Sequence, residues 1–114
     1  MDMEDSNMYV FNKEQLEQYV GVDLYKYVIK TDDGRYFSYK YDFEYFIGEI
    51  AEASPNINRV DGIYCCTLDK IHEFKYCKKT NSVMLKLRVE SVDDIKWTDE
   101  REIVLNRCTV IGEV

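Results

Sequence analysis

Apolar residues recur along this chain with two different periods, and the period predicts the element. Alternation of apolar and polar positions is typical of a strand, whereas apolar residues three or four positions apart are typical of a helix. Helical spacing predicts one helix at residues 13–20 and a second near residues 68–76. Alternating runs predict strands at residues 24–30, 35–41, 83–89, 102–105 and 108–111, and a further strand that starts at Gly62 and runs into the second helix.

Glycines mark the ends of two of these elements. Gly21 follows the helix at residues 13–20 and is expected to end it. The dipeptide Asp33-Gly34 is a strong hairpin signal, because both residues tolerate the positive φ angles of a tight turn. It predicts that the strands on either side pair antiparallel.

Three further segments carry weaker patterns. Residues 42–53 fit either a helical stripe or a strand face, with Gly48 inside both. Residues 54–61 are polar and contain the only proline, so they predict a surface loop. Residues 91–100 are also expected to be a loop, one that contains Trp97.

Together these elements predict an α+β fold with one compact domain over residues 1–114, of which residues 1–7 are a polar lead. A twisted, mostly antiparallel sheet is expected to carry two short helices packed on it. A chain of this length can bury roughly two-thirds of its unfolded surface in a single core. The residues expected in that core are Ile63, Leu68, Ile71, Phe74, Leu85, Leu87 and Val104.

The charge of the chain narrows the classes of partner. Its formal net charge is −7, from 22 acidic and 15 basic residues. Direct nucleic-acid binding is not expected, since a reader of phosphates usually presents a basic stripe. No stretch is apolar enough to cross a bilayer, and the acidic start lacks the basic and apolar regions of a signal peptide. These features predict a cytoplasmic protein without membrane contact.

The cysteines do not form a recognisable metal motif. Cys65, Cys66 and Cys77 lie near His72, but no C-x2-C pair is present. Adjacent cysteines on a strand point to opposite faces, which prevents both from binding one ion. We therefore expect no metal and no cofactor, and interpret Cys66 and Cys108 as small core residues.

Three short motifs follow one another in a fixed order. A Tyr-Lys pair at Tyr25 comes first, and a Phe-x-Tyr-x-x-Gly segment from Phe43 to Gly48 comes second, with Asp42 where a leading glycine is usual. The third motif joins a strand to a helix, and Cys65 stands in it where an aromatic residue is usual. It is carried by Gly62, Ile63, Tyr64, Thr67, Leu68, Ile71 and Phe74.

In these motifs the chain resembles an uncharacterised domain that recurs in proteins of giant DNA viruses such as mimiviruses, and more loosely in tailed phages. The resemblance covers about residues 24–110. It implies a viral origin and a compact, β-rich α+β fold. It brings no activity, because none is established for that domain. Its frequent position beside repeat or F-box modules implies an interaction role.

The favoured function is a non-enzymatic protein-interaction module, a viral accessory protein that modulates a host factor or a defence system. Tyrosine and tryptophan suit this role, because they offer a large contact area at low entropic cost. The expected partner is a host or viral protein, met in the cytoplasm of the infected cell or in the virion. The sequence leaves the oligomeric state open. The aromatic candidates for binding are Tyr39, Tyr41, Tyr64 and Trp97.

Three alternatives stay open. A structural component of the virion is one. An ADP-ribosyltransferase-like enzyme would use Tyr64 and His72 first, but the chain lacks that family's Arg…Ser-Thr-Ser…Glu-x-Glu series, and no catalytic residue is assigned. An acidic mimic of nucleic acid that inhibits a host nuclease would need carboxylates gathered on one face. Its candidates are Asp93, Asp94 and Glu100, with Asp99, Glu44, Glu49 and Glu52.

Overall fold

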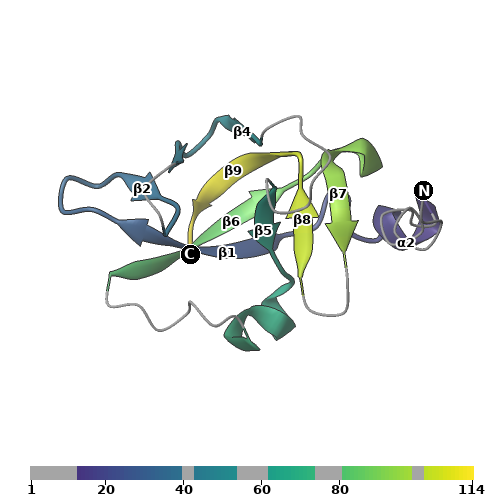
Figure 1. Ribbon diagram of the computed structural model, residues 1–114, viewed down its shortest axis with the longest axis horizontal. Helices are drawn as coiled ribbons and strands as arrows, with labels where there is room; N and C mark the ends of the chain where they lie inside the picture. The colour runs from purple at the N-terminus through teal and green to yellow at the C-terminus, as the bar shows by residue number, and fades with distance from the viewer. Residues whose placement is uncertain (1–12, 40–42, 54–61, 74–80, 99–101) are drawn as a thin grey trace, which may run out of the picture.

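Two antiparallel sheets make up most of the structure. The computed structural model (Figure 1) describes residues 13–39, 43–53, 62–73, 81–98 and 102–114. The larger sheet has six strands in the order β3-β2-β1-β6-β9-β4, and the smaller sheet has three in the order β5-β8-β7. The strands are β1 (Leu24–Lys30), β2 (Tyr36–Phe37), β3 (Glu44–Tyr45), β4 (Ile50–Glu52), β5 (Ile63–Cys65), β6 (Ser82–Arg88), β7 (Ile95–Thr98), β8 (Ile103–Leu105) and β9 (Arg107–Glu113).

Strands β1 and β6 form the centre of the larger sheet, and both were predicted from alternation. They pair antiparallel from Leu24 opposite Leu87 to Ile29 opposite Ser82. Leu24, Leu87 and Leu85 are fully buried. Because side chains alternate between the two faces of a strand, this register places the apolar residues of both strands on one inner face.

The other edge of β1 is divided between two partners. Its last two residues pair with β2, whereas Tyr25, near its start, exchanges both backbone hydrogen bonds with Cys66 at 2.8 and 3.0 Å. Cys66 directly follows β5. The bridge between Tyr25 and Cys66 therefore fastens the smaller sheet to the larger one.

A second junction of the sheets lies at Asn106, the one residue between β8 and β9. Its amide donates to the carbonyl of Asp94 at 2.6 Å, and its carbonyl accepts from the amide of Ala53 at 2.7 Å. A path along the pairings from β1 to β6 and β9, across Asn106 to β8 and β5, and over the bridge from Cys66 to Tyr25 returns to its start. The two sheets thus close into a small barrel around the core.

Buried side chains occupy both faces of β1. The main cluster fills the barrel interior, and a smaller one, formed by Tyr25, Cys66 and Ile71, lies on the opposite face. Both faces of β1 are therefore covered within the described part of the chain. The main cluster consists of Leu24, Val28, Tyr45, Ala51, Ile63, Cys65, Leu85, Leu87, Val89, Ile95, Ile103, Leu105, Cys108 and Val110.

The two short helices expected on the sheet are not confirmed in the described residues. Helix α2 (Lys13–Glu17) has five residues, where residues 13–20 were expected. The chain leaves the turn after it through Gly21, whose φ of 76° is the left-handed conformation expected at that position. η2 (Leu68–Glu73) and η3 (Val92–Asp94) are 3-10 helices. Among the described residues, none of these segments is long and apolar enough to span a membrane.

The predicted hairpin is present, although its second strand is short. Gly34 has a φ of 84° and its amide donates to the carbonyl of Thr31 at 3.0 Å, which closes the turn. Of the strand expected at residues 35–41, Tyr36 and Phe37 form β2, and residues 40 and 41 lie outside the described residues. The amide of Ser38 donates to the carbonyl of Phe43 at 2.9 Å and extends the pairing of β2 with β3. Figure 1 shows this β1–β2 end of the molecule far from α2.

Two further segments differ from their predictions. Residues 43–53 form neither one helix nor one strand, because a turn at Gly48 separates β3 from β4. The prediction of a loop at residues 91–100 is wrong for residues 92–98, which form η3 and then β7. Residues 99 and 100 lie outside the described residues. In β7 the side chains of Ile95 and Trp97 point inward and are buried.

Five of the seven predicted core residues are buried, namely Ile63, Ile71, Leu85, Leu87 and Val104. Leu68 is a wrong prediction, since its side chain is 56% exposed. A 3-10 helix rises by about 2 Å per residue, so Leu68 lies roughly 6 Å from Ile71 along the axis. Only Ile71 reaches the cluster on β1. Phe74 lies outside the described residues.

We expect Leu85→Ala to lower the free energy of unfolding by about 2–5 kcal/mol, because it removes fully buried methyl groups and leaves a cavity. Leu68→Ala makes the same chemical change at an exposed position and should cost only about 0.5 kcal/mol. Urea unfolding followed by circular dichroism measures both values. If the two variants unfold at the same urea concentration, the inner face of β6 is wrongly assigned.

Candidate functional site

The aromatic residues nominated from the sequence are buried or half-buried where the structure describes them. Trp97 is only 7% exposed, so its expected role as an exposed anchor is wrong. Tyr39 is half-buried, with its hydroxyl 2.8 Å from Ser82 Oγ. Tyr64 is also half-buried, and it lies on β5, in the other sheet. Tyr41 lies outside the described residues.

Two of the acidic candidates, Asp93 and Asp94, lie in a short helical turn that is held by local hydrogen bonds. Asp93 and Asp94 belong to η3, whose first turn is capped by Ser91: its hydroxyl oxygen accepts from the amide of Asp93 at 3.2 Å. The carboxylate of Asp94 accepts from the amide of Glu90 at 3.3 Å. Glu100 and Asp99 lie outside the described residues. Because the amide of Asn106 donates to the carbonyl of Asp94, the contacts within η3 also support the Asn106 junction.

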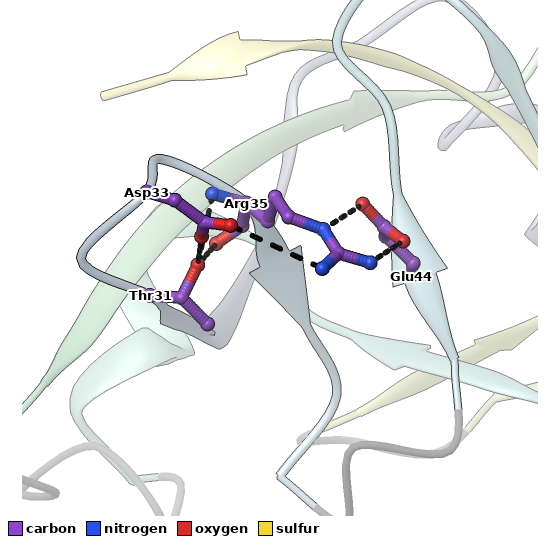
Figure 2. A network of polar contacts seen from close by, with 4 residues as sticks. All are labelled: Thr31, Asp33, Arg35 and Glu44. Atoms are coloured by element: carbon purple, nitrogen blue, oxygen red, sulfur yellow. Dashed lines mark hydrogen bonds and ion pairs between the residues drawn. The ribbon is translucent and has the colours of Figure 1, made fainter.

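Glu44, another acidic candidate, is held in an ion pair. Figure 2 shows the guanidinium of Arg35 donating through Nε and Nη2 to the two carboxylate oxygens of Glu44, at 3.0 and 2.9 Å. Arg35 also lies over the ring of Phe37, 4.8 Å from its centre, and within 4.0 Å of Asp33, whose carboxylate accepts from the hydroxyl of Thr31. The hydrogen bonds from Arg35 lower the pKa of Glu44. This network ties the β1–β2 hairpin to β3.

A second ion pair closes the same end of the molecule. Lys30 Nζ and the hydroxyl of Tyr36 both donate to Glu113 Oε1, each at 2.8 Å. The hydrogen bond from Lys30 lowers the pKa of Glu113, and the bond to Glu113 raises the pKa of Tyr36. The last residues of β9 are thus attached to β1 and β2.

The described cysteines are poor ligands and poor nucleophiles. Burial raises the pKa of Cys65 well above its ordinary value and that of Cys108 to about 12, so neither forms the reactive thiolate readily. Cys65 and Cys66 lie in different clusters on opposite faces, as predicted for neighbours on a strand. Over the residues that the structure describes, no three His, Cys, Asp or Glu side chains are grouped to hold a metal ion.

The feature that stands out on the surface is a group of four exposed aliphatic and aromatic side chains, which we call the apolar patch. Phe46 and Ile47 follow β3, Ile50 begins β4, and Ile111 belongs to the neighbouring strand β9. Their side chains are 51%, 47%, 53% and 39% exposed. Adjacent exposed apolar residues of this size mark interaction sites more often than isolated ones do.

The turn between β3 and β4 brings the patch together. The amide of Glu49 donates to the carbonyl of Phe46 at 3.1 Å, and Gly48 has a φ of 87°, which is the pattern of a type II turn. Gly48 then donates to the carbonyl of Val110 at 2.7 Å, while Val110 donates to that of Glu49 at 2.9 Å. Two residues facing one in this way form a β-bulge. It places Ile47, at the corner of the turn, next to β9.

The patch borders the edge of the larger sheet at β4. Strand β4 pairs with β9 on one side and is the last strand of its sheet, along the upper side of β9 in Figure 1. Glu49 and Glu52 are exposed beside the patch, and Arg107 Nη1 on β9 lies 3.5 Å from Glu52 Oε1. The surface therefore combines apolar side chains, an acidic border and a strand with one partner among the described residues.

The sequence contained a signal for this turn that periodicity alone does not reveal. The pattern at residues 42–53 fitted a helical stripe that includes Phe46, Ile47 and Ile50 as well as a strand face, and none of these three residues was nominated for binding. Glycine two positions after Phe46 is what a type II turn requires at its third residue. A turn there would have placed the stripe at the surface.

The chain matches none of the family models, none of the curated proteins and none of the solved structures with which it was compared. The resemblance to a viral domain and the functions inferred from it are therefore proposals, and the surface just described is the main support for a function.

We expect Gly48→Ala to destabilise the protein by about 1–2 kcal/mol, because a side chain at a φ of 87° is strained. Gly112→Ala is a matched control. An added Cβ meets nothing within 4 Å at either glycine, but only Gly48 has a positive φ. Thermal unfolding of both variants measures the difference. Equal stability of the two would contradict the turn geometry given for Gly48.

The ion pair between Arg35 and Glu44 should contribute stability that depends on pH. Because the pKa of Glu44 is lowered in the folded state, its contribution is present above the ordinary glutamate pKa, about 4.3, and is lost as the pH falls through the folded value. Glu44→Gln should therefore be less stable than the natural protein at pH 7, and the gap should close towards pH 3. Urea unfolding at each pH tests this. A gap that stays constant would show that Glu44 is not stabilised as its ionised form.

Proposed function

We propose that this protein is a non-enzymatic protein-interaction module that binds a host or viral protein through the apolar patch formed by Phe46, Ile47, Ile50 and Ile111. The single observation that carries the proposal is the exposure of these four side chains in the β3–β4 turn and on the paired strands β4 and β9. Burying apolar area at an interface releases water and drives association. Large side chains near the centre of such a surface supply most of the binding energy.

The other nominated groups support this role less well. The described aromatic candidates are buried or half-buried. Among the described acidic candidates, Glu44 and Asp94 have partners within the fold, Glu52 shares an exposed ion pair with Arg107, and Asp93 and Glu49 are exposed on different elements. A mimic of nucleic acid needs carboxylates that are available to a basic cleft. The apolar patch is exposed among the described residues.

The setting of this interaction belongs to the same proposal. The resemblance to a domain of giant DNA viruses supports a viral accessory protein that acts on a host factor or a defence system. The acidic net charge of −7 supports a partner with a basic surface around its own apolar contact. Host cytoplasm is the proposed site of action, with the virion as the alternative.

The test compares two double variants that make similar changes at different places. Phe46→Ser with Ile50→Ser removes two side chains of the patch that are 51% and 53% exposed. Val22→Ser with Leu68→Ser removes two that are 40% and 56% exposed elsewhere. Tagged proteins capture partners from infected-cell extract, and quantitative mass spectrometry compares the amounts. The patch variant should retain at least tenfold less of the specific partner, because anchor residues each contribute 2 kcal/mol or more, about thirtyfold in affinity.

Circular dichroism first establishes that both variants fold. The proposal is wrong if the folded patch variant captures the same proteins, in the same amounts, as the natural protein. It is also wrong if the control variant loses the partner equally, because exposed apolar area as such would then explain the capture.

A further inference from the structure

The hydrogen-bonding direction of β4 follows from its contacts with β9. The amide of Val110 donates to the carbonyl of Glu49, and the amide of Ala53 donates to the carbonyl of Asn106. In an antiparallel pair, successive residues turn their backbone groups alternately towards and away from the partner strand. Residues 49, 51 and 53 thus face β9, and the N–H and C=O groups of Ile50 and Glu52 face away from it.

The side chains of β4 alternate between the outer face of the sheet and the core. The side chains of Ile50 and Glu52 are exposed on the outer face, while Ala51 between them is 5% exposed and turned to the core. A strand laid against β4 would place its own outer side chains next to Ile50 and Glu52. An apolar residue suits the first position and a basic residue the second.

We propose that β4 receives an extended segment of the partner protein as an added antiparallel strand, with a basic residue opposite Glu52 and an apolar residue, two positions later, opposite Ile50. This inference rests on the proposed function and specifies its binding mode. Strand addition supplies backbone hydrogen bonds for affinity and uses alternate side chains for specificity. The antiparallel direction matches every strand pairing within the two sheets.

Charge favours this occupant over a second copy of the same chain. Each copy carries a net charge of −7, so two copies repel one another. Glu49 and Glu52 also place negative charge at the edge itself, which is a common device against pairing between copies. A basic segment turns the same charges into an attraction.

The probe is the synthetic peptide acetyl-Lys-Thr-Val-Thr-Val-amide. In the proposed register its lysine lies opposite Glu52, its first valine opposite Ile50, and its last valine beside the turn at Gly48. Titration into labelled protein, followed by NMR, should shift the amide signals of Ile50 and Glu52 and give an affinity. The reversed sequence, Val-Thr-Val-Thr-Lys, has the same composition and should bind more weakly, because it reaches this pairing only in the parallel direction.

Methylation of selected peptide nitrogens separates strand addition from simple apolar contact. Methyl groups on the lysine and first valine nitrogens block the hydrogen bonds to β4 and should weaken binding at least tenfold. Methyl groups on the two threonine nitrogens point away from β4 and should leave the affinity within about twofold. Equal affinity for the two methylated peptides would overturn the binding mode.

A charge exchange tests the register. Glu52→Lys should weaken binding of the lysine peptide about threefold and strengthen binding of a peptide with glutamate in that place, as expected for an exposed ion pair. An unchanged preference would overturn the register. Sedimentation at the NMR concentration should show a monomer, and a dimer that Ile50→Glu dissociates would overturn the choice of occupant.

These outcomes are independent of the test of the proposed function. If the Phe46 and Ile50 double variant loses its cellular partner while both methylated peptides bind alike, the patch is an interaction site and strand addition is wrong. If that double variant keeps its partner, the proposed function itself is wrong, whatever the peptides do.

Discussion

The fold depends on the division of one edge of β1 between two partners. Tyr25, near the start of the strand, bonds to Cys66 of the smaller sheet, and the last residues of the strand bond to β2. A strand of the larger sheet is therefore bridged to the smaller one, which holds the two sheets around a common interior. This is also why β1 must be apolar on both faces, with Leu24 and Val28 inside the barrel and Tyr25 beneath η2.

The sequence predicts the long strands because each has enough residues for alternation to be recognised. The strands at Leu24 and Ser82 and the hairpin at Gly34 all follow from local pattern and turn chemistry. Among the short strands, β5 and β8 also follow from their patterns, whereas β3, β4 and β7 do not. The run at Ile95 carries only one full alternation and follows two aspartates, so the polar neighbours hide a strand whose burial of Trp97 is decided by pairing with β8.

The candidate site was even harder to predict from local pattern than the short strands. Aromatic content directed attention to tyrosines, yet many tyrosines in a small domain are used for packing, as the contacts of Tyr36 and Tyr39 illustrate. Whether Phe46 and Ile50 face the core or the solvent depends on the bulge at Gly48 opposite Val110. That bulge is a contact between segments about sixty residues apart. Gly48 signals the turn locally, but a local pattern does not show the pairing with Val110 that forms the bulge.

The burial of the described thiols gives the protein an internal indicator of its own opening. Alkylating reagents attack the thiolate, and Cys65 and Cys108 remain protonated at neutral pH while they are enclosed between the sheets. Cys66, also fully buried, lies at the bridge that joins the sheets. Modification of these three side chains therefore requires separation of the strands around them. The rate at which iodoacetamide alkylates each thiol, followed by mass spectrometry, therefore reports how often the strands around that thiol separate in the native protein. No engineered label is needed.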